Sequence, residues 1–216
     1  MTTKEGMTKA EMIKREIRMV ELRAAEATSE EERIVEGRAV VYDSPTVMYE
    51  VDGIEYYEVI ARGALDGADM RDVPFKYNHS DSVMVMARTR NNTLQLTVDD
   101  QGMVVRANLA NTTAGRDLYE LVKRGDIDKM SFAFTVAEDS YDKDTRTRTI
   151  KRFKKIWDAS AVDTPAYPDT SLSARSYFEA QAEAEAQAKA ALESEEQRKA
   201  LERAELRKRL LLRTYC

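Results

Sequence analysis

The sequence of 216 residues contains one cysteine, Cys216, and one histidine, His79. A single cysteine cannot form a disulfide within the chain, and one cysteine with one histidine makes a poor zinc site. No apolar run approaches the roughly 18 residues that cross a bilayer, and the first residues, MTTKEGMTKAEM, lack the apolar core of a signal peptide. We therefore expect a soluble, intracellular protein without a metal or other cofactor.

An excess of positive charge is also missing. The chain has 34 basic and 39 acidic residues, which are intermixed, and its net charge is -5. A nucleic-acid-binding domain would show a basic face, so we expect neither nucleic acid nor a membrane as a partner. Hydrophobic residues make up 43% of the chain, enough for a core, whereas 34% charged residues indicate that part of it is solvated helix.

The composition divides the chain into three regions. Residues 1–15 are polar and are predicted to form an N-terminal arm, and residues 16–175 have a mainly β pattern. Residues 176–216 consist almost entirely of Ala, Glu, Gln, Lys, Arg and Leu, with acids early and bases late, which favours a long helix. Its apolar face is weak and no heptad persists. The helix is either a partner-binding arm or a solvated tail.

Short runs of alternating apolar and polar residues predict strands in the central region. Asp52-Gly53 separates two such runs in VMYEVDGIEYYEVI, a strong hairpin signal. Similar pairs of runs surround Asp99 to Gly102 and the polar loop of SFAFTVAEDSYDKDTRTRTIKRF. A fourth hairpin is predicted from EIRMVELRA and RIVEGRAVVYD, which the polar TSEEE separates.

One helix interrupts these strands, in NTTAGRDLYELVKRGD. Thr112 or Thr113 can cap its start, and Gly125 can end it. Three apolar residues at helical spacing predict the face that packs on a sheet or barrel: Leu118, Leu121 and Val122.

His79 lies in VPFKYNHSDS, where an apolar strand gives way to polar residues. Taken alone, it fits a surface or strand-end histidine with a satisfied hydrogen bond. To act as a general base, it would need a nucleophile within hydrogen-bond reach and a third group that fixes its tautomer. The interpretation of His79 therefore depends on residues elsewhere in the chain.

Ser131, in GDIDKMSFAFTV, is the most suitable nucleophile. Alternation along the predicted strand puts Phe132, Phe134 and Val136 toward the core and Ser131, Ala133 and Thr135 on the other face. Small side chains around one hydroxyl leave room there for an extended substrate, although an ordinary half-buried strand has the same pattern. Three other serines adjoin the histidine or lie in a charged loop and are less suitable: Ser80, Ser82 and Ser140.

Two carboxylates in KKIWDASAVDTPAYPDTS are candidates for the third group. Asp158 is predicted in mid-strand, where a carboxylate needs a cationic or N–H partner. Asp163 precedes the turn sequence TPAYP, where aspartate is expected for local hydrogen bonding. Asp158 is the preferred candidate, but spacing alone leaves both open.

Several segments occur in the order and at the intervals of a known family: EGRAVVYDSPT, VIARGAL, FKYNHSDSVMVMARTRNNTLQL, DDQGMVVRANLANTTAGRDLYELVKRGDIDKMSFAF and IWDASAVDTPAYPDTSLSAR. In these segments the chain resembles the prohead (head maturation) proteases of tailed bacteriophages. The resemblance covers roughly residues 16–175. It implies an α+β fold related to herpesvirus assemblin, with a closed or partly closed antiparallel β-barrel flanked by helices, to which the long C-terminal helix is added.

The resemblance also implies a serine endopeptidase that cleaves scaffold and capsid precursors, with itself as a further candidate substrate. It would act during procapsid maturation, inside the procapsid in the bacterial host cytoplasm. The NH motif gives His79 as base and the GDI-x-x-MSF-x-F motif gives Ser131 as nucleophile. Asp158 takes the place of the usual glutamate of the third motif and is one methylene shorter. No cofactor or metal is implied, and the oxyanion donors stay open between backbone N–H groups and an arginine such as Arg88 or Arg116.

The expected partners are the major capsid protein precursor and the scaffold, onto which the C-terminal helix could dock. Whether the chain forms a homo-oligomer is left open by the sequence. The main alternative is a non-catalytic scaffold or assembly module with the same β-fold. His79 and Ser131 in their motif contexts argue against it. A nucleic-acid-binding barrel is disfavoured by the acidic balance and by the lack of a basic, aromatic strand face.

Overall fold

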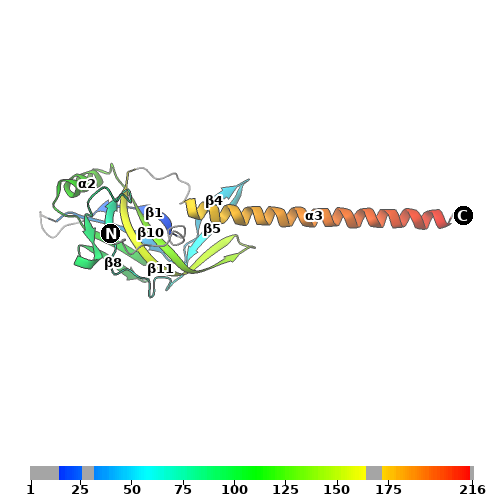
Figure 1. The fold of residues 1–216 in the computed structure, drawn as a ribbon, viewed down its shortest axis with the longest axis horizontal. Coiled ribbons are helices and arrows are strands. Elements are labelled where there is room, and N and C mark those ends of the chain that lie inside the picture. Colours follow the sequence, from blue (N-terminus) through cyan, green and yellow to red (C-terminus); the bar gives the residue numbers. More distant parts are fainter. Residues whose placement is uncertain (1–14, 26–31, 164–171, 215–216) are drawn as a thin grey trace, which may run out of the picture. The chain divides into compact units, whose positions relative to one another are not determined.

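The computed structural model describes residues 15–25, 32–163 and 172–214 (Figure 1), and within the last segment it describes the side chains of residues 176–205. The chain divides into two compact units, Met1–Arg175 and Ser176–Cys216. Helix α3 (Leu172–Thr214) accounts for the described part of the second unit. The arm predicted for residues 1–15 lies outside the described residues except for Arg15, and the division into three regions stays a prediction.

The described strands form two sheets. The first contains, in spatial order, β1 (Arg15–Glu21), β10 (Lys129–Asp142), β11 (Thr147–Val162), β5 (Ile54–Ile60) and β4 (Thr46–Val51), with β6 (Pro74–Tyr77) on β11 and β7 (Ala87–Arg88) on β6. The second contains β2 (Arg23–Ala24), β3 (Ile34–Val41), β9 (Gly102–Asn108) and β8 (Leu94–Asp99). A short 3-10 helix, η1 (Thr89–Asn91), follows β7.

The mixed α+β class and the long C-terminal helix are confirmed, but of the closed or partly closed antiparallel barrel that the resemblance implies, no closed barrel is found among the described strands. Both sheets are open in the described part of the chain. One edge of β11 pairs with β10 along its whole length, and the other edge receives β5 at residues 147–150 and β6 at residues 159–161, both in parallel. Because β11 has 16 residues, the two ends of this edge accept different strands, β5 at one end and β6 at the other. The sheet therefore extends beyond β11 and does not close on itself.

Three of the four predicted hairpins are confirmed. Strands β4 and β5 pair around Asp52 and Gly53, whose φ angles of 53° and 75° give the left-handed turn that Asp-Gly favours. Strands β8 and β9 also pair as predicted, as do β10 and β11. The first hairpin is wrong for most of its length. Strand β1 pairs with β10, and only the two residues of β2 pair with β3.

Gly37 explains how β3 can lie close to the end of β1. A Cβ at this position would come within 2.2 Å of the carbonyl oxygen of Glu21, so only glycine permits this approach. The chain can therefore leave one sheet after Glu21 and enter the other within two residues.

Helix α2 (Thr113–Arg124) begins and ends where the sequence predicts. The Thr112 hydroxyl accepts a hydrogen bond from the Gly115 N–H at 3.2 Å, and Gly125 has a φ of 82° and bonds back to the last turn. Leu118 and Val122 are buried. Leu121 is 37% exposed, so it lies at the margin of the apolar face.

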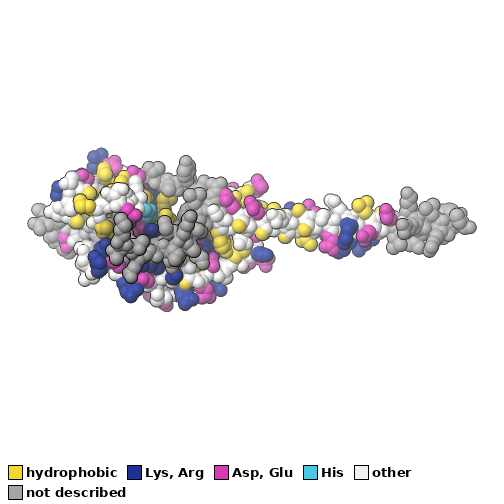
Figure 2. Space-filling model, in the orientation of Figure 1, with side chains coloured by type: hydrophobic (Ala, Val, Ile, Leu, Met, Phe, Trp, Pro, Cys, Tyr) yellow, Lys and Arg dark blue, Asp and Glu magenta, His cyan; other side chains and the backbone are white. Residues whose placement is uncertain are grey.

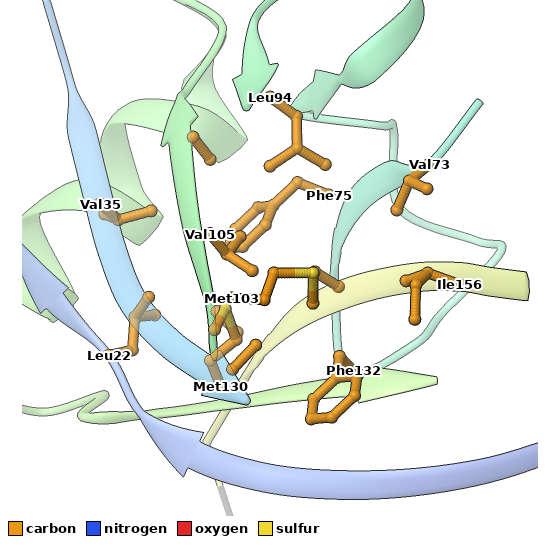
Figure 3. Packing of buried hydrophobic residues seen from close by; sticks show 14 of the residues in the cluster. Leu22, Val35, Val73, Phe75, Leu94, Met103, Val105, Met130, Phe132 and Ile156 are labelled. Carbon is orange, nitrogen blue, oxygen red and sulfur yellow. The ribbon is translucent and has the colours of Figure 1, made fainter. Parts of the chain in front are cut away.

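The core of the first unit lies between the strands and α2 and is built from side chains of both sheets, several of which are seen in Figure 3. Phe132 and Phe134 of β10 are buried as predicted and stack with centroids 5.2 Å apart. Phe153 of β11 meets Phe134 edge to face at 4.9 Å. Such aromatic contacts add to the burial of apolar surface and hold together the two strands that carry the candidate site.

Candidate active site

The loop after β6 positions His79. Tyr77 pairs with Ala161 of β11, and the next two residues, Asn78 and His79, have φ angles of 51° and 53°. Left-handed backbone is uncommon outside glycine, although Asn and His tolerate it better than most residues. Two consecutive residues of this kind turn the chain sharply back over β11. The His79 N–H donates to the Ser160 hydroxyl at 3.2 Å and fixes this turn.

Ser131 reaches the ring from the neighbouring strand. It is the third residue of β10 and pairs with Ser160 of β11. Its Oγ lies 2.9 Å from Nε2 of His79, a normal hydrogen-bond distance. The two residues are 52 positions apart in the sequence.

Asp158 lies on the other side of the ring, so that Ser131, His79 and Asp158 form a continuous row of contacting side chains, called the row below. Because it lies two residues before Ser160 in β11, its side chain is on the same face of the strand. Its Oδ1 contacts Nδ1 of His79, and its side chain is only 2% exposed. The Ser160 hydroxyl lies 3.3 Å from both Oδ1 and Nδ1. The structure therefore brings together the three residues that the sequence selected.

Asp163 lies elsewhere. It accepts hydrogen bonds from the Tyr77 hydroxyl at 2.5 Å and from the Asn78 side-chain amide at 2.9 Å, and its own N–H donates to Asn78 Oδ1 at 3.3 Å. These bonds support the turn that precedes His79. The geometry favours Asp158 as the carboxylate that faces the ring.

The environment of His79 favours the neutral imidazole. Burial lowers the pKa of His79 to about 4, and the positive charges of Arg15 and Lys76 act in the same direction. The ring is therefore uncharged near neutral pH and can accept a proton. Since a carboxylate can only accept a hydrogen bond, Nδ1 carries the proton toward Asp158, and Nε2 is left to accept one from Ser131.

The second face of β10 is covered, contrary to the prediction of an open face. Ser131 is 1% exposed, Ala133 is fully buried and Thr135 is 6% exposed. A β-bulge in the pairing with β11 brings Trp157 over this face, where its indole N–H donates to the Thr135 hydroxyl at 2.8 Å. The His79 side chain is 21% exposed, and the single histidine is visible at the surface in Figure 2.

Two further described residues contact these three side chains. Ser160 lies two positions after Asp158 in the same predicted strand and belongs to the third motif of the resemblance, but the sequence assigns no role to it. Arg15 contacts Oδ2 of Asp158. Nothing in the sequence signals this contact, since it depends on the unexpected pairing of β1 with β10.

The two arginines named as oxyanion candidates have other partners. Arg88 binds Asp72 at 2.5 and 3.0 Å. Arg116 lies 3.2 Å from Asn111 Oδ1 and 3.3 Å from the Thr113 hydroxyl.

Within the described ranges, no three His, Cys, Asp or Glu side chains are grouped so that they could hold a metal ion. Among these same residues, no helix is both long and apolar enough to cross a membrane.

Comparison with known proteins gives one result. The chain matches the family described as Caudovirus prohead serine protease over residues 18–184, which is more than half of its length and includes all three residues of the row. No curated protein and no solved structure matches the chain.

Proposed function

The chain belongs to the Caudovirus prohead serine protease family, and from this premise we propose that Ser131, His79 and Asp158 are its catalytic residues. The protein is a serine protease of phage capsid maturation and interacts with procapsid proteins. The assignment of roles is supported mainly by one observation, the continuous contact from Ser131 Oγ through the ring of His79 to Asp158.

The chemistry follows from this row. His79 Nε2 takes the hydroxyl proton of Ser131 while Oγ forms a bond to the carbonyl carbon of the scissile peptide. The resulting imidazolium then protonates the leaving nitrogen as the C–N bond breaks, which leaves an acyl-enzyme. Water, deprotonated by the same Nε2, hydrolyses this ester and restores the serine.

Asp158 acts by orientation and charge. It holds the Nδ1–H tautomer of His79 and stabilises the imidazolium that forms in each step, without taking up the proton itself. Asp158 is one methylene shorter than glutamate, and the left-handed turn at residues 78–79 is consistent with this length because it brings the ring close to β11.

We expect the substrates to be the major capsid protein precursor and the scaffold, with the chain itself as a further candidate. Cleavage would take place inside the procapsid, in the cytoplasm of the bacterial host. Helix α3 is proposed to dock onto scaffold helices, because the described side chains from residue 179 to 205 are mostly exposed and include many charged groups among the alanines. In Figure 2 acidic and basic patches are scattered along the visible face of the helix, between uncharged and hydrophobic side chains.

A fluorophosphonate probe tests the nucleophile without knowledge of the cleavage site. The folded wild-type protein is expected to be labelled at Ser131, and Ser131→Ala is expected to lose the label and to cleave co-expressed precursors about a millionfold more slowly. Ser140→Ala, which changes an equivalent side chain elsewhere in β10, serves as the control. Labelling of the Ser131→Ala variant at another serine would refute the assignment, and an unlabelled wild type would favour the non-catalytic assembly module.

A further inference from the structure

We propose that Arg15 is a positioning residue of the protease: its guanidinium fixes the carboxylate of Asp158 and, through it, the ring of His79. This inference rests on the proposed function of the three catalytic residues. Arg15 lies three positions before the first residue of the family match, and its side chain crosses from β1 over β10 to reach β11.

The two oxygens of Asp158 have separate partners. Oδ1 contacts His79 and Ser160, whereas Oδ2 contacts Arg15. Rotation of an aspartate carboxylate about its last bond has a broad, roughly two-fold profile. Contacts on Oδ1 alone therefore leave the plane of the carboxylate poorly fixed. A guanidinium on Oδ2 removes this freedom, so that Oδ1 stays aligned with Nδ1.

The burial of the Arg15 guanidinium costs free energy, and a purely structural role does not explain this cost. Its Nε is buried and has no hydrogen-bond partner among the described residues, and burial lowers the pKa of its guanidinium. A buried donor without a partner costs free energy and calls for an explanation. The guanidinium carbon also lies 6.0 Å from the centre of the Trp157 ring, which limits its movement.

Strand β1 holds Arg15 in place through its opposite face. Alternation along the strand directs Glu16 and Arg18 away from Asp158, into a buried group of charges. Arg18 binds Glu58 of β5 at 2.6 Å, and Arg148 of β11 binds Glu16 at 2.8 Å. These ion pairs fix the register of an edge strand that, among the described strands, pairs with β10 alone.

Arg15 also acts on His79 by charge. The charged groups around the ring are Asp158 from β11, Arg15 from β1, and Lys76 from β6, which is itself paired with Asp81 at 2.5 Å. Arg15 and Lys76 both lower the pKa of the imidazole. Removal of Arg15 therefore raises this pKa, and more of the base is protonated at any given acidic pH.

The test measures the rate of fluorophosphonate labelling of Ser131 in the full chain across the acidic and neutral pH range. Arg15→Ala is expected to slow labelling about 100-fold, as for a small misplacement of a catalytic group, and to move the acid limb of the profile to higher pH. Arg15→Lys, which keeps the charge, is expected to keep the limb in place and to recover most of the rate. Arg23→Ala, which removes an exposed arginine of β2, is the matched control and should leave the profile unchanged.

A double variant separates positioning from a general effect on stability. If Arg15 acts through Asp158, then Arg15→Ala on an Asp158→Asn background adds less than about threefold to the loss. A full additional loss, or an unmoved acid limb in the single variant, would overturn the proposal. Arg15→Gln takes the place of the alanine variant in every arm if thermal unfolding shows that the latter does not fold.

The same assay keeps the two proposals distinct. Loss of the label in Ser131→Ala establishes the nucleophile independently. A wild-type rate in Arg15→Ala would then remove the role of Arg15 and leave the proposed function unaffected.

Discussion

At the scale of single residues, two aspartates five positions apart have different surroundings. Asp158 contacts the ring of His79, whereas Asp163 binds Tyr77 and Asn78 in the turn before it. We predict that Asp158→Asn lowers the turnover of a purified precursor about ten-thousandfold, because the amide no longer stabilises the imidazolium. Asp163→Asn should cost less than about tenfold, since its amide oxygen can still accept one of the two bonds of the turn.

The comparison requires both variants to fold, which circular dichroism and thermal unfolding can establish. Gel analysis of precursor cleavage under single-turnover conditions then gives the two rates. If the Asp163 variant proves to be the severe one, the carboxylate has been chosen wrongly.

The residues that could be predicted are those that have a motif around them. His79, Ser131 and Asp158 all stand in short patterns that resemble a family, whereas the mid-strand place of Asp158 only made it the preferred one of two aspartates. Arg15 could not be predicted, because its role depends on a contact between residues 143 positions apart and on the place of β1 beside β10. Local sequence carries no information on either. That Trp157 covers one face of β10 could not be predicted either, because it results from a β-bulge in the pairing of β10 with β11, which local sequence does not reveal.

At the scale of elements, local signals predicted hairpins and caps but not the order of the sheet. Asp52-Gly53, Thr112 and Gly125 act on their own neighbours, and each has the expected conformation. The parallel pairing of β5 and β6 with β11 joins segments about 90 residues apart. Long-range contacts of this kind depend on how complementary faces meet, which alternation of apolar residues does not specify. The closed or partly closed barrel was expected from the resemblance, whereas the described strands form open sheets.

The buried charges that connect β1, β5 and β11 give a prediction for element stability. Glu58 is 4% exposed and lies between Arg18 and Arg148. Glu58→Gln removes the negative charge and leaves two buried guanidinium groups with one carboxylate fewer. We expect the free energy of unfolding to fall by about 3–5 kcal/mol, as measured by urea denaturation with the slope of the transition compared between variants.

The control is Glu138→Gln in β10, whose carboxylate is 55% exposed and lies 3.6 Å from Arg152. An exposed ion pair of this kind contributes little, so this variant should unfold close to the wild-type midpoint. Equal effects of the two substitutions would mean that the buried charges do not hold β1 in the sheet.

At the scale of the whole molecule, the protease unit is followed by a helix that has a different physical character. Helix α3 has 43 residues, a length of about 65 Å. Leu192 and Leu201 are strongly exposed, and they lie on opposite sides of the helix at 100° per residue. Over residues 176–205, whose side chains the structure describes, these two leucines therefore do not form a continuous apolar stripe that could pack on a partner in the manner of a coiled coil.

The charges of α3 are distributed unevenly along its length. Up to residue 196, acidic residues outnumber the two basic ones, Arg175 and Lys189: Glu179, Glu183, Glu185, Glu193, Glu195 and Glu196. From residue 197 on, basic residues outnumber the two acidic ones, Glu202 and Glu205: Arg198, Lys199, Arg203, Arg207, Lys208, Arg209 and Arg213. This order suits the helix dipole. It also suits an extended helical partner that places basic residues beside the acidic part of α3 and acidic residues beside its basic part, because complementary charge directs encounter and orientation.

This distribution determines the last prediction. Deletion of residues 186–216, which begins after the family match ends at residue 184, should leave fluorophosphonate labelling of Ser131 unchanged while greatly reducing the number of proteases found in purified procapsids.

Replacement of Arg198, Lys199 and Arg203 by Glu should reduce packaging in the same way without shortening the helix, and the loss should vary with salt as expected for exposed charges. Both variants are counted by mass spectrometry of procapsids against the capsid protein. Because catalysis and packaging are measured separately, normal packaging of the truncated chain would show that the protease unit carries its own binding surface for the procapsid. If α3 is only a solvated tail, both variants should be packaged into procapsids at the wild-type level.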